Sequence, residues 1–160
     1  MMNKNKVAKA KYEEAGTWVF WDIDDCPVPR SCKSQEIAQK IISALNKLNY
    51  CGPLSISAYG DMNHIPPSIK QALSSTGIFL KHVLPNMFRS HMFNEMLDWK
   101  YEIPTPANLM VISRSELLSI TFDEPKAGHN ILLVHHPHSS EDSVAFAKTR
   151  WLWRGLLEEP

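Results

Sequence analysis

The sequence predicts an α/β fold in which helices cover both faces of a mostly parallel, five-stranded sheet. The first observation is the stretch Thr17–Asp22, whose apolar run WVFW has no polar alternation and therefore suits a strand buried on both faces. The second is that short strand-like segments alternate along the chain with segments at helical spacing. Such alternation indicates βαβ crossovers, which give a parallel sheet with helices on each side.

The first half of the chain supplies two helices and two further strands. A helix is expected from Ser34 to about Asn49, because isoleucine and leucine recur there at helical spacing. Leu54–Tyr59 alternates apolar and polar residues, which predicts a strand. Pro66 and Pro67 then start a short helix, since proline suits a first helical turn, and a third strand follows at Ile78–Val83.

The second half repeats the pattern. Arg89–Glu102 carries an apolar stripe at helical spacing and predicts a long helix. Asn108–Ser113 and Asn130–His135 are apolar and predict strands, with a short helix expected between them at Ser115–Phe122. Ser139–Leu157 keeps its apolar residues at helical spacing and predicts a closing helix.

Length and composition indicate one globular domain. The chain has 160 residues, of which 44% are hydrophobic and 21% are charged. Residues 1–16 are polar and are expected to form a flexible tail before a domain at residues 17–157, with no signal peptide or membrane span. A formal net charge of zero argues against strong sequence-independent nucleic-acid binding, although a local basic groove stays open. Three cysteines without a CxxC pair indicate reduced thiols, and Cys26 is expected to be a buried small hydrophobe.

Acidic residues follow the first two predicted strands. Asp22 and Asp24 end the first, and Asp61 follows the second. Because parallel strands bring their carboxyl ends to one edge of a sheet, these side chains are expected to meet there. Carboxylate oxygens suit Mg²⁺ or Mn²⁺, which can activate water for phosphodiester cleavage. The alternative is that these acids only cap loops and helices.

Several separate segments carry a family likeness. WDIDDCPVP at residues 21–29 is followed in order by SAYGD, IPPSIKQALSSTGI, PTPANLMVIS, HNILLVH and AKTRWLWRGLL. These segments resemble the NYN domain family of the PIN-like nuclease superfamily, whose signature is WDIENCPVP. Within that family the chain resembles plant proteins described as endonucleases or glycosyl hydrolases, which are similar to the NYN domain of limkain, a meiosis regulator and mRNA stability factor.

The resemblance implies a PIN-like, Rossmann-like three-layer sandwich over residues 17–157 and an endoribonuclease ancestry that depends on a divalent metal. It also implies a link to regulation of gene expression through single-stranded RNA. The reduced thiols indicate a cytoplasmic location with the nucleus as an alternative, and the resemblance to limkain adds an association with peroxisomes as another. Nothing in the sequence supports the glycosyl hydrolase description, which requires two carboxylates flanking a sugar.

The family's acidic positions are only partly kept. By the resemblance, Asp22, Asp24 and Asp61 correspond to its catalytic and metal-binding acids, with Asp24 replacing a longer glutamate. At three further places the chain lacks an aspartate that the family pattern carries, one at the start of the third long helix and two at the end of the fourth strand. The residues found at the three places are Arg89, Ser115 and Leu117.

An arginine changes the expected charge of the site. A guanidinium can take the place of a cation by pairing with Asp22 or Asp61, and Arg89 and Arg114 can hold RNA phosphate without a metal. We therefore expect an RNA-associated protein with a weak or absent nuclease activity and no required cofactor. One alternative is an active endoribonuclease that uses Mg²⁺ or Mn²⁺ held by the three aspartates and Glu116. Another is a scaffold for protein partners.

Three weaker signals have simpler explanations. On the predicted closing helix Trp151 and Trp153 point about 200° apart, so at most one of them faces RNA. The histidines of residues 135–138 lack an accompanying cysteine pair and suit a structural role better than zinc binding. Glu95 and Asp98 are expected on an exposed helix face.

Overall fold

The computed structural model describes residues 5–84, 87–114, 128–137, 139 and 144–158, including their side chains except those of residues 88–90. Its strands are β1 (Thr17–Asp22), β2 (Leu54–Gly60), β3 (Phe79–His82), β4 (Ala107–Ile112), β5 (His129–His135) and β6 (Thr149–Leu152). Its helices are α1 (Ala10–Glu13), η1 (Ser34–Glu36), α2 (Ile37–Lys47), η2 (Met62–His64), α3 (Pro67–Ser75), α4 (Phe88–Glu102) and α7 (Trp153–Glu158).

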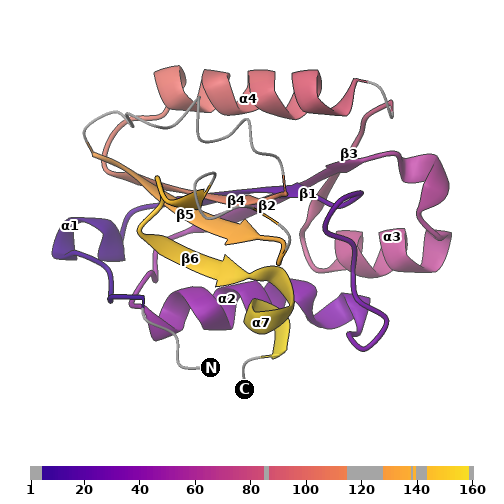
Figure 1. Cartoon of the computed structure of the whole chain (residues 1–160), viewed down its shortest axis with the longest axis horizontal. Coiled ribbons are helices and arrows are strands. Elements are labelled where there is room, and N and C mark those ends of the chain that lie inside the picture. Colours follow the sequence, from indigo (N-terminus) through magenta and orange to yellow (C-terminus); the bar gives the residue numbers. More distant parts are fainter. Residues whose placement is uncertain (1–4, 85–86, 115–127, 138, 140–143, 159–160) are drawn as a thin grey trace.

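The six strands form one parallel sheet in the order β3-β2-β1-β4-β5-β6. Helix α4 lies on one face of the sheet, and α2, α3 and α7 lie on the other (Figure 1). The α/β class and the three layers predicted from the sequence are confirmed. None of the helices in the described ranges is both long and apolar enough to cross a membrane.

The strand order fixes where a site can form. The chain moves from β1 outward to β2 and β3, and then returns to the other side of β1 with β4. In open parallel sheets, ligands bind beyond the carboxyl ends of the strands at the point where the order reverses. The residues that follow β1 and β4 therefore lie at the position where this fold places its binding sites.

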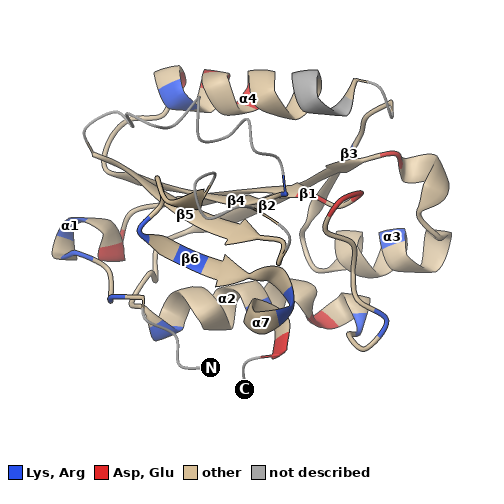
Figure 2. Ribbon diagram, in the orientation of Figure 1, with Lys and Arg blue, Asp and Glu red and all other residues tan. Residues whose placement is uncertain are grey.

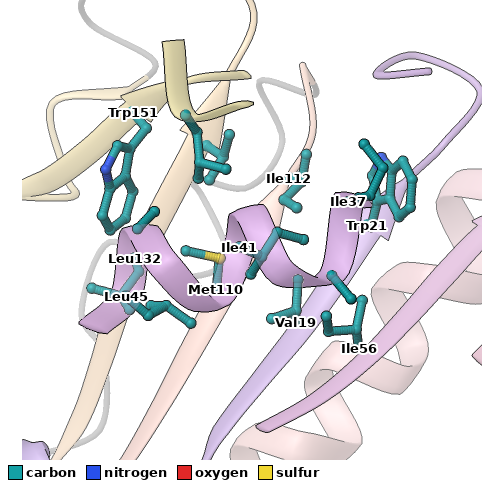
Figure 3. Close-up of a cluster of buried hydrophobic side chains, with 14 of the residues drawn as sticks. Val19, Trp21, Ile37, Ile41, Leu45, Ile56, Met110, Ile112, Leu132 and Trp151 are labelled. Carbon is teal, nitrogen blue, oxygen red and sulfur yellow. The ribbon is translucent and has the colours of Figure 1, made fainter. Parts of the chain in front are cut away.

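The core on the α2 face joins the helix to four strands. Ile37, Ile41 and Leu45 form the inward stripe of α2, because spacings of four residues return to the same side of a helix. They pack in one buried cluster with alternate residues of the strands (Figure 3). These strand residues are Val19, Trp21, Ile56, Met110, Ile112 and Leu132. Each fully buried aliphatic side chain contributes roughly 1.5–3 kcal/mol to folding.

A second buried cluster lies under α4. The intervening strand residues, such as Phe20, Tyr59 and Val111, point to this face. Met92 and Met96 of α4 pack against them. The strands of the sheet centre are thus apolar on both sides, as the unalternating sequence of β1 predicts.

The closing part of the chain corrects the sequence prediction. Ser139–Leu157 was expected to form one helix, but residues 149–152 form the strand β6, and the helix α7 (Trp153–Glu158) begins only after that strand. The strand forms because β6 pairs in parallel with β5, an interaction that helical spacing along the sequence does not reveal. It also raises the strand number from the predicted five to six. The helix expected at residues 115–122 lies outside the described residues.

Residues 5–16 belong to the segment predicted as a flexible tail. In the structure Ala8 and Tyr12 are buried in the α2-face core. The Ala8 N–H donates to the Leu48 carbonyl at 2.7 Å, and the Asn108 side chain donates to the Tyr12 carbonyl at 3.2 Å. This segment therefore packs along the amino-terminal edge of the sheet.

Candidate functional site

Asp22 ends β1 and is fully buried, with 0% of its surface exposed. Its Oδ1 accepts the Asp25 N–H at 3.1 Å, whereas its Oδ2 is buried and accepts no hydrogen bond from any described group. Burial above all, together with the neighbouring charges of Asp25 and Asp24, raises the pKa of Asp22 from 3.8 to about 8, and the hydrogen bond from the Asp25 N–H acts in the opposite direction. Asp22 is therefore mostly protonated at neutral pH.

Asp24 is exposed, and its side chain links the segment after β1 to the segment after β2 by a hydrogen bond. Its Oδ2 accepts the Asp61 N–H at 2.9 Å. The backbone of Gly60 approaches so closely that an added Cβ would lie 2.7 Å from Asp24 Oδ1. Glycine is needed here because no side chain fits between the two strand ends. One oxygen of Asp24 is thus used in holding the loop.

Asp61 is only 6% exposed and has partners of its own. It caps η2 by accepting the Asn63 N–H at 3.1 Å, and its Oδ2 lies 3.2 Å from His64 Nδ1. His82 Nδ1 lies 3.8 Å from Asp61 Oδ1 and accepts the Met62 N–H at 3.1 Å. Sequence reasoning missed both histidines. The signal for His82 was available, because it ends β3 at the same edge of the sheet.

The turn after β1 is held by two indoles. Trp21 Nε1–H donates to the Cys26 carbonyl at 2.7 Å, and Trp153 Nε1–H donates to the Pro27 carbonyl at 2.9 Å. The two rings lie 5.3 Å apart and are tilted. Trp151 is buried as well, so neither tryptophan of this segment is exposed to RNA.

Cys26 lies in the same turn with 1% of its surface exposed, which confirms the prediction of a buried, hydrophobic cysteine. Burial raises the pKa of its thiol to about 12, and the charges of Asp22 and Asp25 act in the same direction. The positive charge of Arg114 opposes this shift. Cys26 is therefore a neutral thiol and not a nucleophile.

Arg114 follows β4 and is exposed beside the β1 turn. Its effect on the Cys26 thiol places a cation near the acids that end β1. Arg89 lies in the first turn of α4, and its side chain is outside the described residues. The described residues also leave out Ser115, Glu116 and Leu117 entirely. The roles expected for Arg89 and for these three residues therefore stay predictions.

The fold brings the three aspartates to one edge of the sheet, but each has a different environment. Figure 2 shows the acidic segments after β1 and β2 at the same end of the sheet. Within the described ranges, no three His, Cys, Asp or Glu side chains are grouped so that they could hold a metal ion. The buried Asp22 Oδ2 is the one feature among these acids that suits a metal ligand. The carboxylates of Asp24 and Asp61 each accept a backbone N–H.

A family model described as NYN domain matches residues 16–151. The chain belongs to the NYN domain family. The NYN domain is a PIN-like ribonuclease domain that acts on RNA, and NYN nucleases typically use divalent metals. No curated protein matches the chain, so the likeness of this NYN domain to limkain and to the plant proteins stays a prediction.

Proposed function

We propose that this NYN domain binds single-stranded RNA at the carboxyl edge of its sheet and has a weak or absent nuclease activity. Its role would be the regulation of gene expression through RNA stability. The observation that carries the proposal is that the protein itself engages all three aspartates: Asp22 is buried and accepts the Asp25 N–H, Asp24 accepts the Asp61 N–H, and Asp61 accepts the Asn63 N–H. We further propose a cytoplasmic location, because Cys26, Cys32 and Cys51 are free thiols.

Charge supports a weakened metal site. Asp22 has a pKa near 8, so at neutral pH a metal ion must displace a proton before it can bind there. Asp24 and Asp61 each use oxygens in holding loops. By the family likeness, arginine, serine and leucine stand at three further positions where a more acidic site is expected. Fewer negative oxygens then remain for Mg²⁺ or Mn²⁺.

RNA binding at the same edge does not require the metal. Arg114 is exposed and follows β4, next to the point where the strand order reverses. An arginine there can pair with a phosphate through two parallel hydrogen bonds. Arg89, in the first turn of α4, is the second phosphate contact that we propose. On this proposal the protein needs no cofactor to bind RNA.

One observation favours the alternative, an active endoribonuclease. Asp22 Oδ2 is a buried acceptor without a hydrogen-bond donor among the described residues. Such an oxygen lowers the stability of the fold unless a donor or a metal ion contacts it. Asp22, Asp24, Asp61 and Glu116 would hold Mg²⁺ or Mn²⁺ in that case. The ion would supply Lewis-acid activation of water and stabilisation of the leaving oxygen.

A cleavage assay separates the two functions. Single-stranded RNA is incubated with the wild-type protein and with Asp22→Asn, in Mg²⁺, in Mn²⁺ and in chelator. We expect little or no difference among these conditions. Robust metal-dependent cleavage that is lost in Asp22→Asn would establish the active enzyme and overturn the proposal.

RNA binding is tested with a matched pair of arginine variants. Arg114→Gln removes the proposed phosphate contact, and Arg154→Gln removes an exposed arginine from α7. The first is expected to weaken binding of a single-stranded oligonucleotide by about fivefold to tenfold at low salt, and the second to leave it unchanged. Equal affinities for the two variants would remove Arg114 from the binding surface.

A further inference from the structure

A groove lies between α4 and the strands β1, β2 and β3, on the face of the sheet opposite α2. Its volume is about 450 Å³. Trp18 and Phe20 of β1 and Phe79 of β3 contribute aromatic surface to it, and Phe79 is 60% exposed. Acidic residues of α4 form the opposite wall. We call this feature the α4 groove.

One end of the α4 groove already holds a cation. Lys81 Nζ lies 2.7 Å from Glu95 Oε1 and 5.4 Å from the ring centroid of Tyr59. His91 Nε2 lies 2.8 Å from the other Glu95 oxygen. Burial and the negative charge of Glu95 raise the pKa of Tyr59, so its ring stays neutral. This end therefore combines a carboxylate, an aromatic ring and a positive charge in one contact.

The other end of the α4 groove also combines carboxylates with an aromatic ring, but no cation is paired with them among the described residues. Asp98 and Glu102 lie three and seven residues after Glu95, line the same groove and are exposed. Neither forms an ion pair with any described residue. Trp18 lies beside them, because its ring packs edge-on against Trp99 of α4 at 6.0 Å. Two unpaired carboxylates thus lie next to an accessible aromatic side chain.

We propose that the α4 groove binds an extended segment of a partner protein that contains arginine. The guanidinium would sit at the Trp18 end, where it can pair with Asp98 and Glu102 while stacking on the indole. Exposed Phe79 would contact an apolar side chain of the same segment. RNA does not suit this surface, because its phosphates would face two unpaired carboxylates.

The edge of the sheet makes the groove reachable. β3 is an outer strand of the sheet, and its residues Phe79 and Lys81 line the groove. A peptide can therefore enter from the side, past a single short strand, without displacing α4. The protein would then use two separate surfaces, one for RNA and one for a protein partner. The second does not depend on whether the carboxyl edge of the sheet retains catalysis.

The proposal is tested with an acetylated peptide of alternating arginine and valine and with the same peptide in which citrulline replaces arginine. Binding is followed by tryptophan fluorescence and by the indole N–H signals of Trp18 and Trp99. The groove variant is Asp98→Asn/Glu102→Gln, and the control variant is Glu36→Gln/Glu158→Gln. Both pairs remove two exposed carboxylates, but the control pair lies in η1 and α7, on the α2 side of the sheet.

We expect the arginine peptide to bind the wild type and the control variant alike, and to bind the groove variant at least tenfold more weakly. The citrulline peptide should bind the wild type at least tenfold more weakly than the arginine peptide does. A single-stranded RNA should not displace the arginine peptide from the wild type. The proposal is overturned if the groove variant or the citrulline peptide binds undiminished, if RNA displaces the peptide, or if the wild type does not bind it. It is also overturned if sedimentation shows that a second copy of the chain occupies the groove, released by the same substitutions.

Discussion

The Asp22→Asn variant should become more stable than the wild type as the pH rises from 5 to 8. The folded-state pKa of about 8 lies above the ordinary value of 3.8, so the folded protein binds the Asp22 proton more tightly than the unfolded chain does. The stability that this proton provides is fully present below pH 3.8 and is lost as the pH rises towards 8. By linkage the loss is at most about 1.4 kcal/mol per pH unit, or about 2–4 kcal/mol between pH 5 and pH 8 after relaxation of the buried site.

Asparagine keeps the Oδ1 acceptor for the Asp25 N–H and carries no titrating proton. We therefore expect the free energies of unfolding of Asp22→Asn and wild type to agree within about 1 kcal/mol at pH 5. Their difference should grow in favour of the variant up to pH 8. Urea unfolding in chelator at pH 5, 6, 7 and 8 measures it, and Asp98→Asn controls for the loss of one exposed charge. A difference that stays constant across this range would mean that Asp22 is ionised in the folded protein.

Three further predictions concern packing and reactivity. Gly60→Ala should lower the free energy of unfolding by about 1–3 kcal/mol, because its Cβ would lie 2.7 Å from Asp24 Oδ1; an unchanged urea midpoint would contradict this close approach. Ile41→Ala should cost about 2–5 kcal/mol in the same measurement, since Ile41 is fully buried, and a cost below 1 kcal/mol would mean that the α2 core can collapse around the gap. Iodoacetamide should label exposed Cys51 in the folded protein and label Cys26, whose pKa is near 12, only after unfolding; equal labelling rates by mass spectrometry would refute this.

The central strands could be predicted because their sequences encode burial directly. β1 has the predicted bounds, since a continuous apolar run flanked by glycine and acidic residues leaves little choice of conformation. β6 could not be predicted in this way. Residues 149–152 keep helical spacing with their neighbours, and only the outer edge of β5, which is distant in sequence, makes a strand the better solution.

The candidate site shows the same division. Topology alone placed Asp22, Asp24 and Asp61 at one edge, because strand ends in a parallel sheet converge. Their partners depend on local geometry, and η2 brings His64 to Asp61 in a way that no periodicity predicts. The exposure of Asp98 was predicted correctly from helical spacing. That Asp98 lines a groove depends on the distance between α4 and an outer strand, which the sequence does not contain.

The hydrogen bond from Trp153 to the Pro27 carbonyl has a consequence for synthesis of the chain. Trp153 follows Pro27 by 126 residues, so the loop that bears the acidic residues leaves the ribosome well before the indole that anchors it. Until Trp153 has been synthesised, this loop lacks one of its two anchors. The surface that we assign to RNA is therefore encoded before it can be completed, so a nascent product that stops short of Trp153 carries it in unfinished form.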